Sequence, residues 1–376
     1  MNETPLDCAL RAIANAVPDT ADNSQRIVAA KCGALMVGYD AAFGRIDYTP
    51  LSAEQFVETP LINPDTNQRS RTFTVAGRLD VTCLYHGRTV LIDHKTTSSA
   101  INEPDHPFWR QLAIEGQVSH YMLLEWLSGR KVDEAVWDVV RKPMISPRKI
   151  SKAERAHAVA NRTWFGQALS GETLDALQTC ESETLEMYSA RLAHDCAKER
   201  PQWYFQRRTV PRLDSEIIEY ARELWEHGQE ILHVRNTNRH VRNSGACMLY
   251  GSPCKFLGIC SGYDTPDSDN WQVKAQVHNE LPELNCDGRS VLTNSRIRCF
   301  QTCRRKHYYE YELGISRIDE EEREALFFGT IWHHALAAWW EHYLNTRSHD
   351  NGNCDQGSPA ERAGKYGSHS EAVIAE

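Results

Sequence analysis

Two carboxylates and a lysine close together in a β-rich stretch could hold a divalent cation and use it to hydrolyse a phosphodiester. Asp80 ends one strand-like segment, and Asp93 and Lys95 lie two residues apart in LIDHKTTS. This spacing in a strand places Asp93 and Lys95 on one face. Phosphodiester hydrolysis needs cations that neutralise developing charge and generate hydroxide, and a nearby lysine can orient that water or stabilise the transition state. Hard carboxylate oxygens favour Mg²⁺ or Mn²⁺ over zinc.

A surface hairpin with solvated charges is the competing interpretation, and an isolated D-x-K sequence is weak evidence against it. The context favours a metal site. Asp93 directly follows the apolar run VLI, which is expected to be buried. A charged pair at the end of a buried strand needs partners or a metal ion.

The order of these motifs resembles that of RecB-type nucleases in the PD-(D/E)XK superfamily, which have G-x-x-D, then D-x-K-T, then Q-x-x-x-Y. In this sequence the three motifs are Gly77 to Asp80, Asp93 to Thr96, and Gln117 with Tyr121. The resemblance implies that Asp80 and Asp93 bind the metal and that Lys95 is catalytic. It also implies that the backbone carbonyl of His94 is a metal ligand.

Gln117 and Tyr121 are the weakest part of this motif series. The resemblance implies that both help to orient the site and the DNA strand. Their four-residue spacing places them on one face of a helix, from which both can reach the same cleft. A tyrosine on such a face is more often part of the core, and that alternative stays open.

Three cysteines suggest a second inorganic group. Cys247, Cys254 and Cys260 lie within fourteen residues in CMLYGSPCKFLGIC, where Gly and Pro would let the chain wrap around a cofactor. Zinc sites usually contain closely paired cysteines, whereas iron-sulfur clusters accept more varied spacing. The alternative is three unlinked cysteines packed as small hydrophobic residues.

A fourth cysteine is suggested by the resemblance. In the iron-sulfur branch of the family, which includes CRISPR-associated and helicase-linked members, one cysteine lies near the start of the domain in an F-x-x-C-x-x-K/R-x-x-Y context. Phe300, Cys303, Lys306 and Tyr309 match this pattern. The resemblance therefore implies a 4Fe-4S cluster held by Cys303 together with the three cysteines of the other segment.

The same region of the family continues into an apolar helix with G-x-x-x-H, in which the histidine binds metal. Gly329 and His333 match this spacing in FFGTIWHHALAAWW. The neighbouring His334 is the alternative, and a histidine flanked by tryptophans is by default a packed core residue. The spacing favours His333.

The order of these segments departs from the family. Cys303 and His333 should precede Asp80 and Asp93, but they follow them by more than two hundred residues. Placing residues 291–345 ahead of residue 1 would restore the family order. A circular permutation, a truncated tandem of two nuclease copies and a gene model cut at an arbitrary origin would each explain this, and the sequence does not choose among them.

The pattern of apolar residues predicts the elements that position these side chains. Helices are expected in 8–45, 108–127, 149–197 and 213–234, and strands in EQFVETPLI, RTFTVAGRLDVTCLY, RTVLIDHKT, DEAVWDVVRKP and WYFQRRTV. The expected fold is α/β, a central mixed β-sheet flanked by helices like that of restriction endonucleases, with helical additions and a cysteine segment. The expected domains are a nuclease core in 1–261, a linker in 262–290, a helical module in 291–345 and a disordered tail in 346–376.

The composition bears on the surface charge of the protein and on its cellular compartment. Net charge is −9, which argues against a surface coated in positive charge, although 235–245 and 303–309 are locally basic and could meet phosphates. Either patch could equally be an ordinary solvated face. No apolar run approaches the roughly 20 residues of a membrane helix, and the first residues lack a secretion signal. With twelve cysteines outside a secreted framework, a reducing cytoplasm is expected.

The function expected from sequence is therefore a Mg²⁺- or Mn²⁺-dependent deoxyribonuclease. Exonuclease or single-strand-directed activity in DNA repair, recombination or phage DNA processing is the usual setting of its relatives, with DNA as substrate and a helicase or recombination protein as partner. The alternative is a catalytically weak DNA-binding accessory protein that keeps the fold. A redox or metal-storage protein is a third interpretation, but it leaves the D-x-K hairpin unexplained.

Overall fold

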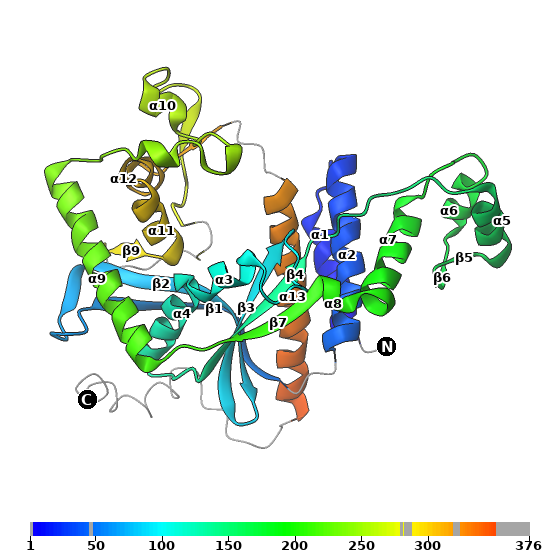
Figure 1. Cartoon of the computed structure of the whole chain (residues 1–376), viewed down its shortest axis with the longest axis horizontal. Coiled ribbons are helices and arrows are strands. Elements are labelled where there is room, and N and C mark those ends of the chain that lie inside the picture. Colours follow the sequence, from blue (N-terminus) through cyan, green and yellow to red (C-terminus); the bar gives the residue numbers. More distant parts are fainter. Residues whose placement is uncertain (1–2, 45–47, 279–280, 282–287, 319–323, 351–376) are drawn as a thin grey trace.

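The computed structural model describes residues 3–44, 48–278, 281, 288–318 and 324–350. A mixed sheet at its centre has the order β1-β2-β3-β4-β7, with β9 added beside β2 (Figure 1). Its strands are β1 (Thr49–Ile62), β2 (Arg69–Tyr85), β3 (Arg88–Thr97), β4 (Glu134–Arg141), β7 (Phe205–Val210) and β9 (Ser290–Leu292). The pairs β3–β4 and β2–β9 are parallel, and the others are antiparallel. The predicted fold class, an α/β fold with a mixed central sheet flanked by helices, is confirmed.

Helices cover both faces of this sheet. One face packs against α1 (Pro5–Ala16), α2 (Asn23–Phe43), α7 (Leu185–His194) and α13 (Glu324–Asp350), and the other against α3 (Pro107–Ala113), α4 (Gly116–Leu127), α9 (Asp214–Thr237) and α11 (Asn294–Thr302). Along β3, Ile92 joins the first core and Leu91 the second. Burial on both faces explains why this strand reads as a continuous apolar run before Asp93.

The hairpin that presents the D-x-K motif is closed by two residues. His86 and Gly87 both have positive φ, 48° and 79°, as a type I′ turn requires. Strands β2 and β3 pair as the D-x-K hairpin, with the turn at His86-Gly87. Glycine adopts positive φ at little steric cost, which favours Gly87 at the second position of the turn.

The described parts of 291–345 fold together with the rest of the described chain. The short strand β9 pairs with β2 from Phe73 to Val75. Helix α13 buries Trp332, Trp339 and Trp340 fully in the core that it shares with α1 and α2. Segments distant in sequence therefore build one hydrophobic core, whatever the origin of their order.

Two helix predictions are wrong in detail. The single helix expected over 108–127 is divided into α3 and α4, because Arg212 donates hydrogen bonds to the carbonyls of Ala113 and Glu115 at the break, at 2.8 and 3.4 Å. A helix in this place would use those carbonyls itself. The break lets α4 begin a new direction at Gly116.

Residues 149–197, where long polar helices were expected, form instead a small lobe of short helices and a hairpin, at the right of Figure 1. It contains α5 (Lys152–Asn161), the hairpin β5 (Thr163–Trp164) and β6 (Gln167–Ala168), and α6 (Gly171–Ala176), before α7. Ser151, Ser170 and Thr184 cap α5, α6 and α7, respectively. A tight turn with positive φ at Phe165 and Gly166 interrupts the helical run.

Helix α8 (Pro201–Tyr204) leads into β7 and packs in the same core as α2. Around the cysteine segment lie α10 (Leu257–Ser261), α12 (Arg304–His307), β8 (Trp271–Val273) and β10 (Ile315–Arg317). Strand β8 lies within the region 262–290, which was expected to be a linker, and it pairs with β10. Most of the tail expected from residue 346 lies outside the described residues. No helix in the described ranges has both the length and the apolar character needed to cross a bilayer.

Candidate metal centre and active site

The predicted site lies where strand β2 changes partners. It pairs with β9 over Phe73 to Val75 and with β3 over Val81 to Tyr85, so Asp80 stands just before the point where β2 and β3 join. Across this fork, the backbone N–H of His94 donates to Asp80 Oδ2 at 2.7 Å. This bond fixes one carboxylate oxygen of Asp80 and leaves the other, Oδ1, to face α13.

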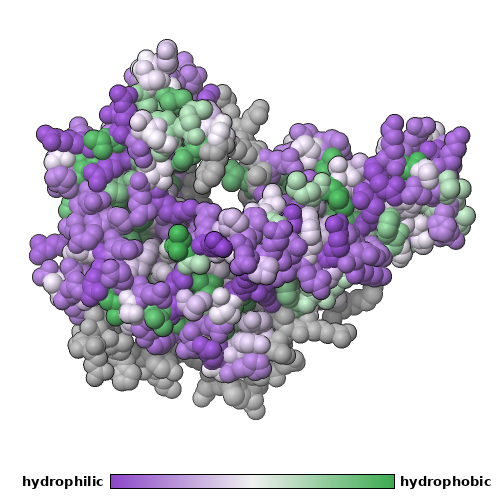
Figure 2. All heavy atoms as spheres, viewed as in Figure 1, coloured by the Kyte–Doolittle hydropathy of each residue, from purple (hydrophilic) through white to green (hydrophobic). Residues whose placement is uncertain are grey.

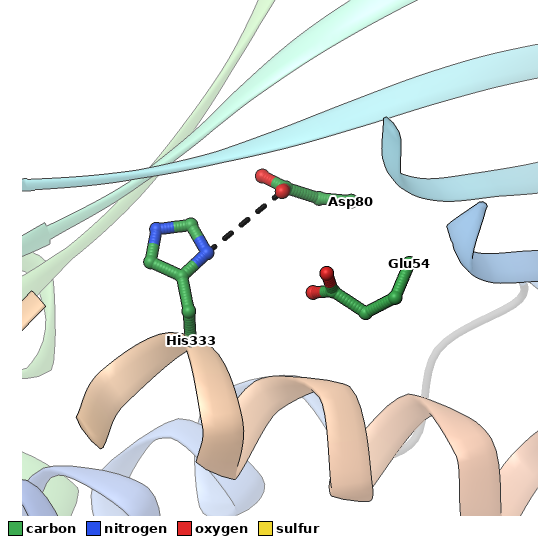
Figure 3. A group of neighbouring side chains, drawn as sticks. All are labelled: Glu54, Asp80 and His333. Carbon is green, nitrogen blue, oxygen red and sulfur yellow. Dashed lines mark ion pairs between the residues drawn. The ribbon is translucent and has the colours of Figure 1, made fainter. Parts of the chain in front are cut away.

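Glu54, Asp80 and His333 form the only group of three or more metal-ligating residues in the described part of the chain whose ligand atoms all lie within 4.8 Å of one another. They come from β1, β2 and α13, and Figure 3 shows their side chains converging on one space. His333 Nδ1 lies 3.8 Å from Asp80 Oδ1. Two carboxylates and an imidazole at this spacing can hold one Mg²⁺ or Mn²⁺ ion, whose remaining positions would be filled by water and substrate.

Glu54 is absent from the residues predicted from sequence. It stands opposite Asp80 in the β1–β2 ladder, between the pairs Ala53↔Val81 and Gln55↔Leu79. Its φ of 49° is rare for a residue other than glycine, and such backbone strain gathers at functional sites. Glu54 opens the predicted strand EQFVETPLI, but only the pairing register shows that it meets Asp80.

The charge environment of Glu54 also suits a cation. Burial, reinforced by the neighbouring Asp80 carboxylate, raises the pKa of Glu54 to about 7, although Arg78 opposes the shift. Arg78 Nε forms an ion pair with Glu54 at 2.7 Å. A divalent ion between Glu54 and Asp80 would relieve the repulsion between these two carboxylates.

Asp93 and Lys95 form a pair beside this group. Lys95 Nζ donates to Asp93 Oδ2 at 2.5 Å and lies 4.9 Å from the centre of the Trp137 ring. Asp93 is 1% exposed, and burial raises its pKa while the Lys95 ammonium opposes that shift. Its other oxygen, Oδ1, is buried and accepts no hydrogen bond from the described residues. A buried carboxylate oxygen without a donor is the kind of atom that a metal ion or its water would satisfy.

The Q-x-x-x-Y pair also reaches this site. Gln117 Oε1 accepts from Lys95 Nζ at 2.9 Å, and Gln117 Nε2 donates to Tyr121 Oη at 2.9 Å. Gly77 makes this approach possible, since a Cβ there would lie 2.9 Å from both Tyr121 and Leu124. The glycine of the G-x-x-D motif is therefore required by close packing of α4 on β2.

The two adjacent histidines of α13 face different surroundings. His333 points towards Asp80, whereas His334 is exposed on the helix surface. Burial lowers the pKa of His333, although Asp80 opposes the shift. The neutral imidazole is the form that binds metal.

His94 lies on the opposite face of β3 from Asp93 and Lys95. Its imidazole lies between Asp138 and Trp340, with Nδ1 3.1 Å from Asp138 Oδ2 and Nε2 accepting from Trp340 Nε1 at 3.1 Å. The side chain therefore points away from Asp93 and Lys95 and towards α13, and its ring centre lies 6.3 Å from that of His333. The metal-ligand prediction for His94 concerns its backbone carbonyl alone and stays a prediction.

The predicted cluster ligands are gathered in a separate lobe, at the top left of Figure 1. Burial raises the pKa of Cys260, and the nearby thiols of Cys254, Cys303 and Cys247 raise it further. Cys254 and Cys260 pack against an aromatic cluster that contains Phe256. Figure 2 shows hydrophobic residues gathered over this lobe. A fifth cysteine, the partly buried Cys299, precedes Cys303 by one helical turn and was not predicted.

Much of the basic sequence expected to meet phosphates has structural partners. Arg235 binds Glu312 in a bidentate ion pair at 2.6 and 2.8 Å. Arg242 donates to the carbonyl of Cys260, and Arg305 to that of His240. These side chains hold the cysteine lobe together, so the interpretation as a bare phosphate-binding patch loses weight.

The comparisons with known proteins bear on the C-terminal segment. Residues 291–365 match the family model of the PD-(D/E)XK nuclease superfamily. This match includes Cys303 and His333 but neither Asp80 nor Asp93. Searches of curated proteins and of solved structures found no match. The matched segment is thus similar to a nuclease superfamily, and the chain as a whole has a mixed sheet and flanking helices of the restriction-endonuclease-like α/β kind.

Proposed function

We propose that this protein is a Mg²⁺- or Mn²⁺-dependent deoxyribonuclease that hydrolyses phosphodiester bonds. The observation that carries the proposal is the convergence of Glu54, Asp80 and His333, from three elements, next to the Asp93–Lys95 pair. Such a set combines metal ligands with a positioned ammonium group. A retired site would have no reason to keep all of these groups within reach of one another.

Each side chain has a role in the proposed reaction. A bound divalent ion would supply charge neutralisation and a water of lowered pKa. Asp80, Glu54 and His333 would hold it, and Asp93 would add its free Oδ1. Lys95, fixed by Asp93 and Gln117, would orient the attacking water or stabilise charge that develops on the phosphate.

The finer parts of the proposal rest on the family resemblance. They are the choice of DNA as substrate, attack at an end or on a single strand, and a role in repair, recombination or phage DNA processing in the cytoplasm. A helicase or recombination protein is the proposed partner. The match of residues 291–365 to a nuclease superfamily supports the substrate class.

The proposal includes a 4Fe-4S cluster with a structural role, which Cys247, Cys254, Cys260 and Cys303 hold and which joins their two segments of the chain. The four thiols are neighbours, and the backbone N–H of Asn243 donates to Cys303 Sγ at 3.3 Å, a contact that suits a thiolate. Among the described residues these sulfurs do not form a group within 4.8 Å. A single zinc ion would need its ligand atoms closer together, so the proposal is a cluster rather than a zinc ion.

Cleavage of labelled single- and double-stranded DNA by anaerobically purified protein tests the nuclease proposal. We expect cleavage with Mg²⁺ or Mn²⁺, none with EDTA, none from His333→Ala, and normal cleavage from His334→Ala, a matched control on the same helix. Normal activity of His333→Ala would refute the metal assignment. A folded wild-type protein that binds DNA without cleaving it would favour the alternative of an accessory protein.

Iron content and the visible spectrum test the cluster separately. Wild type and Cys180→Ser, whose cysteine lies in the distant α5–α7 lobe, should contain iron and absorb in the visible range. Cys260→Ser should lose both signals. A colourless, iron-free and folded wild-type protein would exclude the cluster while leaving the nuclease proposal intact.

A further inference from the structure

A buried hydrogen-bonded network lies on the reverse face of the D-x-K strand. Its centre is Asp138 on β4, which is 1% exposed. The Tyr39 hydroxyl from α2 donates to Asp138 Oδ2 at 2.5 Å, and the Arg207 guanidinium from β7 lies 3.3 Å from each carboxylate oxygen. Arg207 also donates to Tyr39 Oη at 2.8 Å. A buried charge with this many partners costs much more to disrupt than a surface pair.

The same carboxylate defines the state of the His94 ring. The Trp340 indole can only donate a hydrogen bond, so His94 Nε2, which it contacts at 3.1 Å, must carry a lone pair. The proton of the neutral ring is then on Nδ1, which lies 3.1 Å from Asp138 Oδ2 in a contact that lacks hydrogen-bond geometry. His94 is therefore held in one tautomer by Trp340 of α13, with the Asp138 carboxylate of β4 in contact with its other nitrogen.

This arrangement is connected to the metal group through the backbone. The N–H of His94 donates to Asp80 Oδ2, and His94 lies between Asp93 and Lys95 on β3. A shift of the His94 ring would move this stretch of β3 and with it the Asp80 carboxylate. The Asp138 carboxylate itself lies behind the strand, next to neither Glu54 nor His333 among its contacts.

We propose that Asp138 is a positioning residue that acts through His94 to hold Asp80 in its metal-binding geometry. The inference rests on the proposed metal-dependent function and adds to it a group that lines no part of the metal site. Trp340 and His333 lie on the same helix, so the network also ties the docking of α13 to the placement of Asp80. Partners of this kind behind metal ligands typically contribute about 10- to 100-fold in metal affinity.

Mn²⁺ binding, followed by the electron paramagnetic resonance signal of free Mn²⁺, tests the proposal. Asp138→Asn should weaken binding by about 10- to 100-fold. Tyr39→Phe keeps the ring and removes one donor to Asp138, and should weaken binding less. Glu183→Gln is the matched control: Glu183 is a buried carboxylate paired with Arg191 at 2.6 Å in the α5–α7 lobe. It should lower Tm and leave Mn²⁺ affinity unchanged.

Wild-type Mn²⁺ affinity in folded Asp138→Asn would overturn the proposal, as would an equal loss in Glu183→Gln. If Asp138→Asn does not fold, unchanged affinity in Tyr39→Phe would overturn it instead. Nitrogen NMR of the wild-type imidazoles gives an independent signature, since His94 should carry its proton on Nδ1 and a proton on Nε2 would contradict the network. Failure of the proposed function is distinguishable, because wild type itself would then bind no Mn²⁺.

Discussion

Replacing Glu54 with Gln should change how strongly the metal affinity depends on pH. A cation binds the ionised carboxylate, so a protonated Glu54 must lose its proton first. Burial and the Asp80 carboxylate raise the pKa of Glu54 to about 7, into the range where this proton matters. The amide of Glu54→Gln has a similar shape and does not titrate between pH 6 and pH 8.

The size of the effect follows from that pKa. A carboxyl group with a pKa near 7 is ionised for about one part in ten at pH 6 and about nine parts in ten at pH 8. Displacing its proton at pH 6 therefore costs about tenfold in affinity, or about 1.4 kcal/mol. Burial raises the pKa of Asp93 too, which adds to the dependence in wild type. Wild type should lose at least about tenfold in Mn²⁺ affinity from pH 8 to pH 6.

Isothermal titration of wild type and Glu54→Gln with Mn²⁺ at pH 6 and pH 8 measures this difference. The variant should bind more weakly at pH 8, and its affinity ratio between the two pH values should be smaller by about tenfold. Circular dichroism at both pH values controls for unfolding. Equal pH dependence in the two proteins would refute the assignment of Glu54 as a metal ligand.

Three further predictions concern packing, catalysis and metal removal. Gly77→Ala should lower Tm and the free energy of unfolding by about 1–3 kcal/mol, because its Cβ would lie 2.9 Å from the Tyr121 ring; wild-type thermal unfolding would contradict this. Lys95→Met should reduce DNA cleavage at least about 100-fold while Mn²⁺ still binds, and loss of Mn²⁺ binding in a titration would show that Lys95 is structural instead. The raised pKa values of Glu54 and Asp93 stabilise the metal-free fold most below their unfolded pKa values, and this contribution is lost as pH rises through about 7. Mn²⁺ should therefore raise Tm more at pH 8 than at pH 6, and a larger rise at pH 6 would contradict the sign.

Local periodicity was sufficient to predict the parts of the site that lie on one hairpin and one helix. Strand alternation predicts that Asp93 and Lys95 share a face, and in the structure Lys95 Nζ lies 2.5 Å from Asp93 Oδ2. Helical spacing predicts that Gln117 and Tyr121 share a face, and they are hydrogen-bonded to each other. The division between α3 and α4 does not disturb this pair, because it falls just before Gln117.

Long-range pairing decides what the sequence did not reveal. Glu54 becomes a candidate ligand only through the β1–β2 register, which depends on packing across the whole sheet. Asp138 reads as an ordinary residue of a buried strand until β4, β7 and α2 come together. His333 was reached through a family resemblance, since more than two hundred residues separate it from Asp80 and no local pattern connects them.

The location of bound Mn²⁺ tests the central claim most directly. Crystals of the wild-type protein grown with Mn²⁺, with diffraction recorded near the manganese absorption edge, would show the ion as an anomalous difference peak. The peak should lie between Glu54, Asp80 Oδ1 and His333 Nδ1, on the side of Asp80 that faces α13. A peak bound by other side chains, or no peak in crystals of protein that cleaves DNA with Mn²⁺, would contradict the claim that these three residues form the catalytic metal centre.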